Sequence, residues 1–512
     1  MTKVMRPTAL LIGVGLLLGT GCSYGASAAL PAKTAAAAFE PGPCPPTHDP
    51  DPAYDRARCG YLVVPENRAH PNGRTIRLAV AIVPAASPHP APDPVVYLSG
   101  GPGEDPIPSA KVLIEAGLNR DRRLILLSQR GELSSRPALT CANLDEFRAR
   151  GVGLAYDSSA MKRQHLEAAT ACHRKLAATG ADLSAYNTTE NAADVADLRT
   201  ALGIVQWNVY GASYGTDLAL TLMREHPQGI RAVVIDGIVP PDAASLSGFW
   251  RSAREGFDGV FRACEAEAAC RDHYPNLRAT FTGLVRKLEA NPVETTVKLP
   301  TSDTPVKVVL DGGALVNWMV RLISNGQDGS EAPYAIDQLA KGHPETVARQ
   351  WASFWVAPEF YGTFSYGLNY GVICSEWVPY EAPSQLLARG RAEFPDYPDS
   401  VLAQGPQIPF MNEDCRIWNV PKAPASVREP TRSAIPTLVI SGGFDAKTGA
   451  QWGDHAARTL SESKVITIPG MGHGAGIFAP CGHQVVASFL RTPTAPDTDC
   501  VATVSPKPFK TS

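Results

Sequence analysis

The chain has 512 residues, of which 44% are hydrophobic, so it is long enough for one large domain with an insertion or for two or three domains. Its formal net charge is -3, and it has no run of lysine and arginine that could follow a phosphate backbone, so we expect no nucleic-acid binding. Neither C-x-x-C nor H-E-x-x-H spacing occurs, so we expect no metal site and no cofactor.

Residues 1–28 are expected to be a signal peptide, because two basic residues precede an apolar run at 9–21 that is too short to span a bilayer. Two processing routes fit this segment. Ala28 ends an A-x-A cleavage pattern, while Cys22 closes a lipobox-like stretch with Gly19 where a larger aliphatic residue is usual. The protein is predicted to be exported, either secreted or periplasmic, or held at the cell envelope by a lipid on Cys22.

The cysteine count agrees with export, because ten cysteines remain besides Cys22 and could form five disulfides. The number alone leaves the pairing open. Nearness along the chain favours Cys44–Cys59, Cys141–Cys172, Cys264–Cys270, Cys374–Cys415 and Cys481–Cys500.

An Ala- and Pro-rich segment at 29–52 is predicted to be a flexible tether. From 53 to 240, strands alternate with helical patterns, which predicts a doubly wound, mostly parallel α/β sheet. The strand at 76–83 alternates, as half-buried antiparallel strands do, and the strands at 94–98 and 124–127 are continuous apolar runs, as in strands covered on both faces. The expected strands are 61–64, 76–83, 94–98, 124–127, 207–210 and 232–235, with a helix at 187–201.

The stretch 207–216 has the pattern of a nucleophile elbow, a short strand followed by G-x-S-x-G and a helix. Ser213 would sit on a tight turn whose flanking glycines avoid steric collision. The amide of Tyr214 would then lie at a helix N-terminus, where it can donate to an oxyanion. A glycine-flanked serine in an ordinary loop is the alternative, but the strand before it and the helix after it favour the elbow.

A second glycine-rich turn, at 99–103, follows the strand at 94–98 directly. In an acyl-transfer enzyme this turn supplies the second oxyanion donor, and we expect it to be the amide of Gly101. No Gly-Lys-Ser/Thr follows, so it is not a phosphate loop.

Residues 241–430 lose the alternation and become mainly helical and rich in aromatic residues, which predicts a cap inserted into the core. The core resumes over 431–512. Its expected strands are 436–440 and 465–468, and its expected helices are 448–460 and 483–490.

A serine nucleophile needs a general base and a carboxylate that orients the base. Asp445 follows a predicted strand, and His473 lies in a glycine-flanked loop after the next strand, so Ser213, Asp445 and His473 occur in the order expected for this kind of site. Asp236, which ends the strand after the nucleophile helix, is the rival acid. The other histidines beyond the acid fall within or near helices and are His455 and His483.

The chain resembles the secreted tripeptidyl aminopeptidases and related prolyl aminopeptidases of the α/β-hydrolase fold, over nearly the whole mature chain. The resemblance implies the triad and oxyanion donors given above, and an exopeptidase acting on free N-termini. It also implies an acidic cap residue for the substrate's ammonium group, for which Glu376 is the candidate. The motifs that carry it are Gly100–Gly103, Gln129–Gly131, Gly211–Thr216, Cys264 with Cys270, Cys374–Trp377, Asp445 and Gly472–Gly474 ahead of Cys481.

The sequence departs from the prolyl aminopeptidase pattern beside the expected cleft. Ser99 replaces a histidine, residues 104–106 replace small residues, and Ser128 replaces an aspartate. These changes affect the expected specificity more than the expected chemistry. A peptide or ester is the expected substrate; a carboxylesterase with the same triad and a non-catalytic surface binding protein are the alternatives, and the oligomeric state stays open.

Overall fold

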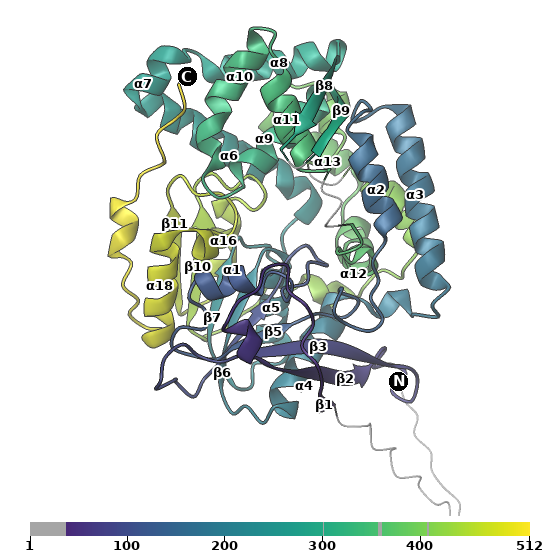
Figure 1. The fold of residues 1–512 in the computed structure, drawn as a ribbon, viewed down its shortest axis with the longest axis vertical. Helices are drawn as coiled ribbons and strands as arrows, with labels where there is room; N and C mark the ends of the chain where they lie inside the picture. Colours follow the sequence, from purple (N-terminus) through teal and green to yellow (C-terminus); the bar gives the residue numbers. More distant parts are fainter. Residues whose placement is uncertain (1–36, 301, 357–360, 407–408, 512) are drawn as a thin grey trace, which may run out of the picture. The chain divides into compact units, whose positions relative to one another are not determined.

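The large sheet has the doubly wound, mostly parallel form that the sequence predicts (Figure 1). The computed structural model describes residues 37–300, 302–356, 361–406 and 409–511. Within them, nine strands run in the order β1-β2-β3-β5-β4-β6-β7-β10-β11, antiparallel from β1 to β5 and parallel from β5 to β11. These strands are β1 (Ala38–Pro41), β2 (Arg58–Pro65), β3 (Thr75–Val83), β4 (Val95–Leu98), β5 (Leu124–Leu127), β6 (Trp207–Ala212), β7 (Ile230–Asp236), β10 (Thr437–Gly442) and β11 (Ser463–Ile468).

Side chains alternate along each parallel strand and divide the core between the two faces of the sheet. In β7, Val233 and Ile235 join one buried cluster, while Ala232 and Val234 join another. Because both faces are covered, the central strands β4 and β5 appear in the sequence as continuous apolar runs. The first face carries α4 (Thr188–Ala201), α5 (Tyr214–Glu225) and α16 (Ala450–Ala457), and the second carries α1 (Ala110–Glu115), α17 (Ala475–Phe478) and α18 (Pro480–Arg491).

The sheet begins earlier in the chain than predicted. Ala38 of β1 lies opposite Val63 of β2, and Cys44 is bonded to Cys59. The prediction of a tether up to residue 52 is therefore wrong from residue 38 onward, because an edge strand and a disulfide hold this segment on the fold. The other four cysteine pairs favoured by nearness along the chain are bonded as well. The predicted signal peptide and Cys22 lie outside the described residues.

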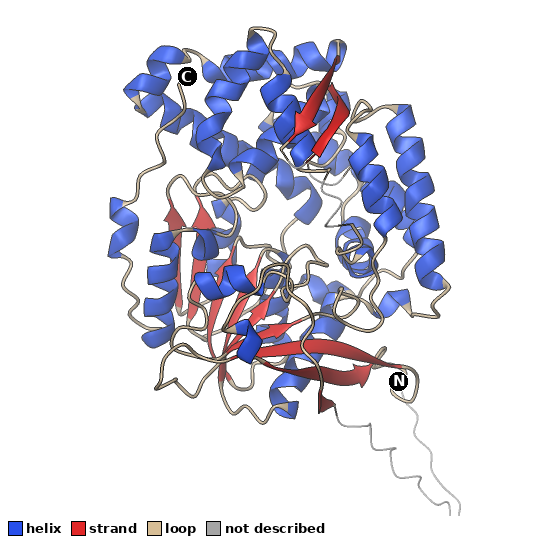
Figure 2. Ribbon diagram, viewed as in Figure 1, coloured by secondary structure: helices blue, strands red, loops and turns tan. Residues whose placement is uncertain are grey.

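Between β7 and β10 the chain leaves the sheet and forms an insertion with its own buried cluster. The insertion is mainly helical, as predicted, but it also contains a hairpin of two strands that the sequence analysis missed (Figure 2). Its elements are α6 (Ser245–Ala266), α7 (Ala268–His273), α8 (Leu277–Ala290), β8 (Val293–Leu299), β9 (Ser302–Leu310), α9 (Gly312–Ile323), α10 (Ala332–Ala340), α11 (Glu345–Ser353), α12 (Tyr366–Val372), a π-helical turn (Ile373–Trp377), α13 (Pro383–Glu393), α14 (Asp399–Leu402) and α15 (Met411–Trp418).

A second helical excursion, which was not predicted, leaves the core before the elbow. It consists of α2 (Ala142–Gly151) and α3 (Ser159–Ala177), which lie beside the insertion (Figure 1). His165 of α3 lies 2.9 Å from both carboxylate oxygens of Asp414 on α15, and Lys162 pairs with Glu413. The cap is therefore built from two separate parts of the chain.

Short 3-10 turns complete the described structure at Tyr54–Arg56, Leu183–Ala185, Asp328–Glu331, Val378–Tyr380, Ala425–Arg428 and Asp499–Thr503. Within the residues that the structure describes, no helix has the length and hydropathy of a membrane span.

Candidate active site

Ser213 lies on the turn between β6 and α5 with φ 56° and ψ -126°, a strained conformation for a residue with a side chain. Its amide donates to the carbonyl of Asp236 at 2.9 Å, which ties the turn to the end of β7. A Cβ at Gly211 would lie 2.2 Å from the carbonyl oxygen of Gly215, and a Cβ at Gly215 would lie 2.0 Å from that of Leu98. The G-x-S-x-G spacing is therefore required by close backbone packing around the serine.

The glycine-rich turn after β4 passes next to the Ser213 side chain. A Cβ built on Gly100 would lie 2.7 Å from Cβ and 3.3 Å from Oγ of Ser213. The next residue, Gly101, has φ 103°, and Tyr214 is the first residue of α5. Both expected oxyanion donors therefore lie near the serine. Tyr214 is its neighbour in the chain, and Gly101 follows the glycine that contacts its side chain.

Asp445 and His473 form a hydrogen-bonded pair at the ends of β10 and β11. His473 Nδ1 lies 2.7 Å from Asp445 Oδ2. The other carboxylate oxygen accepts from the amides of Lys447 at 2.9 Å and Thr448 at 3.0 Å. Burial acts to raise the pKa of Asp445, but the charge of His473 and these hydrogen bonds hold the pKa below its ordinary value. The carboxylate therefore stays ionised beside the imidazole.

Thr448 is a third member of this group that the sequence analysis missed. Its hydroxyl donates to Asp445 Oδ2 at 2.7 Å and lies 3.0 Å from His473 Nδ1. It lies three residues after the acid, within the segment where a helix was predicted to begin.

The histidine loop is held from two sides. A Cβ on Gly237 would lie 2.7 Å from His473 Cε1, so the imidazole packs directly on the residue that follows β7. On the cap side, the His473 amide donates to the carbonyl of Ser324 at 2.9 Å, just beyond α9, and the Ser324 hydroxyl accepts from the amide of Ala446 at 3.1 Å. The Ser213 amide binds the carbonyl of Asp236, so serine and imidazole contact two consecutive residues, the last residue of β7 and the glycine directly after it.

The rival residues are engaged elsewhere. Asp236 Oδ2 accepts from Tyr210 at 2.8 Å and from the amide of Gly476 at 2.9 Å, and burial raises the pKa of Asp236 to about 6. His455 pairs with Asp242 at 2.7 Å, and His483 hydrogen-bonds the carbonyl of Ile477. Of the candidate acids and bases weighed from the sequence, Asp445 and His473 are the two that bond to each other.

Glu376 does not lie where an amine ligand would be needed. It is 3% exposed, and its carboxylate accepts from the amide and the hydroxyl of Thr188 at 2.8 and 2.6 Å. Burial raises the pKa of Glu376 to about 8, and the nearby carboxylate of Asp217 adds to this effect. Glu376 is thus a buried acid linked through the Thr188 hydroxyl to the Tyr214 hydroxyl, and it lies outside the lining of the cavity described next.

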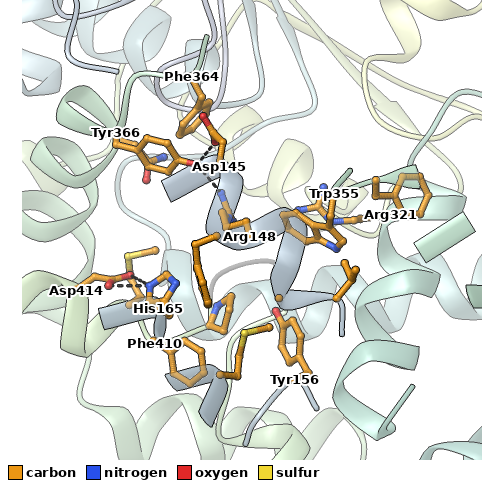
Figure 3. A pocket seen from close by; sticks show the side chains of 18 of the residues that line it. Asp145, Arg148, Tyr156, His165, Arg321, Trp355, Phe364, Tyr366, Phe410 and Asp414 are labelled. Carbon is orange, nitrogen blue, oxygen red and sulfur yellow. Dashed lines mark hydrogen bonds and ion pairs between the residues drawn. The ribbon is translucent and has the colours of Figure 1, made fainter. Parts of the chain in front are cut away.

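A cavity of about 470 Å³ lies between the glycine turn and the cap (Figure 3). It reaches the candidate site at Gly101, Glu104 and Lys447, while the side chains of the proposed triad are not part of its lining. Aromatic rings from the cap cover much of its wall, including Trp351, Phe354, Trp355, Phe364, Tyr366 and Phe410.

Two of the sequence departures meet beside this cavity. The Ser128 hydroxyl donates to Asp105 Oδ2 at 2.8 Å, and the same oxygen accepts from the amide of Ser134 at 2.7 Å. A carboxylate that the prolyl aminopeptidase pattern expects at 128 is therefore supplied from the opposite loop.

The TAP-like protein family matches residues 403–502. The serine protease Hip1 of Mycobacterium tuberculosis is 26% identical, with 86% of this chain and 86% of the relative covered. The tripeptidyl aminopeptidase of Streptomyces coelicolor is 23% identical, with 88% of this chain and 84% of the relative covered. Among solved structures, a thermophilic esterase from Thermogutta terrifontis is 14% identical with a TM-score of 0.37, with 85% and 99% of the two chains covered. The chain thus has the mostly parallel sheet of the α/β-hydrolase fold and is a serine hydrolase similar, over most of its length, to these two relatives.

Proposed function

We propose that this enzyme is an exported peptidase that removes short peptides or residues from free N-termini through an acyl-enzyme on Ser213. The observation that carries this proposal is the common anchoring of Ser213 and the bonded His473–Asp445 pair on the end of β7. The names of the two relatives, a serine protease and a tripeptidyl aminopeptidase, support a peptide substrate. The five disulfides support an oxidising compartment outside the cytoplasm.

In the proposed reaction, His473 takes the proton of Ser213 as the hydroxyl oxygen attacks the carbonyl carbon of the substrate. Asp445 holds the Nδ1–H of the imidazole and stabilises its positive charge. The amides of Tyr214 and Gly101 donate to the oxyanion. The imidazolium then protonates the leaving amine, and a water molecule, activated by the same base, releases the acyl group.

The acid that receives the substrate's ammonium group is proposed to be Glu104 rather than Glu376. Three acids line the cavity, but Asp145 already accepts from Tyr366 and from the amide of Gly362, and Asp414 is bonded to His165 and Tyr370. Glu104 is exposed and lies three residues after Gly101. Glu104→Gln is expected to raise KM for free tripeptides and to leave KM for N-acetylated ones unchanged.

Labelling with a fluorophosphonate probe tests the nucleophile, with Ser213→Ala as the control. A panel of aminoacyl, dipeptidyl and tripeptidyl coumarin amides, run beside p-nitrophenyl esters, tests the reaction. Release of coumarin from unblocked peptides supports the peptidase. Turnover of the esters alone would make the protein a carboxylesterase, and absence of labelling would make it a non-catalytic binding protein.

A further inference from the structure

Three cationic side chains converge on the cavity from separate elements: Arg148 of α2, Arg321 of α9 and Lys447 of the loop after β10 (Figure 3 shows the two arginines). None of them lies within 4.0 Å of a carboxylate oxygen of a described residue. Like charges brought together in a half-buried space repel one another, and burial weakens their hydration. Three acids also line this cavity, but Asp145 accepts from Tyr366 and Asp414 is bonded to His165. A bound ligand with a negative charge would therefore add to the compensation of the cations.

Arg321 has the least compensation. Its guanidinium carbon lies 3.9 Å from the centroid of the Trp355 ring, over which Arg148 also lies at 4.9 Å. Its Nε is buried and has no hydrogen-bond acceptor among the described residues. Burial and the charge of Arg148 lower the pKa of Arg321 to about 10. Keeping Arg321 charged in this place therefore lowers the stability of the folded protein.

Lys447 is fixed close to the candidate triad, because its amide donates to Asp445 Oδ1 at 2.9 Å. Burial and, to a smaller extent, the charge of Arg321 lower the pKa of the Lys447 ammonium group. The acid that faces both cations is Glu104, which is exposed and forms no ion pair with either. Glu104 therefore faces two cations at the end of the cavity nearest the proposed nucleophile. Asp445, which is bonded to His473, is a second acid that acts on Lys447.

We propose that Arg321 and Lys447 bind a carboxylate of the substrate, so that the enzyme prefers peptides or esters with an acidic group near the bond that is cleaved. This inference rests on the proposed function and names its substrate class. A carboxylate offers acceptors to the unpartnered guanidinium N–H groups and counters two charges at once. A substrate amide of the same size supplies one acceptor and no charge, so the structure disfavours it.

The test uses free tripeptidyl coumarin amides that differ only by Glu or Gln at one of the three positions. We expect kcat/KM to favour Glu over Gln at one position by about 10- to 100-fold, the range of a charge-assisted hydrogen bond. In Arg321→Met this ratio should fall to near one, and Arg321→Lys should restore part of it. Arg349→Met is the matched control, because Arg349 is exposed on α11 outside the cavity lining and its loss should leave the ratio unchanged.

Two further measurements separate this proposal from the proposed function. If no peptide is cleaved, p-nitrophenyl hemiglutarate is compared with p-nitrophenyl butyrate, and a preference for the anion that depends on Arg321 supports the carboxylate site while the peptidase fails. Calorimetric binding of glutarate to Ser213→Ala, lost when Arg321→Met is added, supports the site without catalysis. Equal rates for Glu and Gln peptides at every position, equal rates for the two esters and no glutarate binding would overturn the carboxylate site.

Discussion

The position of the His473 imidazole depends on the absence of a side chain at Gly237, and Gly237→Ala tests this dependence. A methyl group there would lie 2.7 Å from His473 Cε1, 2.9 Å from Nδ1 and 3.0 Å from Thr448 Oγ1. Ordinary contact begins at 3.4 Å, so the ring would have to retreat by about 0.7 Å. Thr448 and Asp445 bind the same ring nitrogen, so the movement would also disturb that pair.

Two effects of different size are expected. Gly237 has φ 67°, and an alanine in this left-handed region costs about 1–2 kcal/mol of folding stability. A misplacement of about 1 Å at a catalytic group lowers the rate roughly 100-fold, so a shift of about 0.7 Å should lower kcat by roughly 10- to 100-fold. The loss of activity should thus be much larger than the loss of folded protein explains.

Gly203→Ala is the matched control, because Gly203 has φ 65° and a Cβ there meets nothing within 4 Å. Both variants should lose similar thermal stability, measured by circular dichroism, while Gly237→Ala alone should lose kcat in a coumarin amide or p-nitrophenyl ester assay. If the two variants showed equal kcat, the assignment of His473 as the general base would be refuted.

The remaining predictions concern the hydroxyl beside the triad, the buried acid and one disulfide. Thr448→Val should lower kcat by roughly tenfold, because Asp445 loses a donor, whereas Thr448→Ser should retain most of the activity. The pKa of Glu376 is raised to about 8 in the folded state, so the folded protein holds this proton more tightly than the unfolded chain does. The free energy of unfolding should therefore fall as pH rises toward 8, by at most about 1.4 kcal/mol per pH unit. Urea unfolding of Glu376→Gln should lack this component of the slope; an identical slope in both proteins would contradict the assignment. Replacing Cys374 and Cys415 by alanine should cost about 4 kcal/mol of stability, because the bridge closes a separation of 41 residues, and an unchanged melting temperature would contradict this.

The core could be predicted because its signals are local. Continuous apolar runs such as 95–98 and 124–127 form strands β4 and β5, because a strand covered on both faces needs apolar residues at successive positions. The mostly parallel sheet and the inserted helical cap are confirmed. The hairpin β8–β9 was missed because its exposed, polar outer half hides the alternation in a segment that is otherwise helical.

The triad remains a prediction, but the structure explains why its members could be chosen from the sequence. In a doubly wound sheet, each strand end is a fixed location, so a motif at the end of β6, β10 or β11 specifies a place as well as a residue type. No sequence motif marks Thr448. It reaches the Asp445 carboxylate because the loop after Asp445 folds back on that side chain. Glu376 was chosen for its neighbours in the sequence, and nothing in those neighbours reveals that both its oxygens are occupied by Thr188.

Specificity is less visible because it depends on contacts between distant segments. Ser128 and Asp105 are each a departure from the prolyl aminopeptidase pattern when considered alone, but they are bonded to each other at 2.8 Å. The carboxylate is therefore carried by the loop after β4 instead of the loop after β5, and it stays near the glycine turn. By the same reasoning, Arg321 and Lys447 belong to no motif, because one comes from the cap and the other from the core. Tertiary packing of the cap on the core therefore places these two cations beside the candidate triad. Substrate preference should depend on this packing rather than on the sequence motifs of the triad.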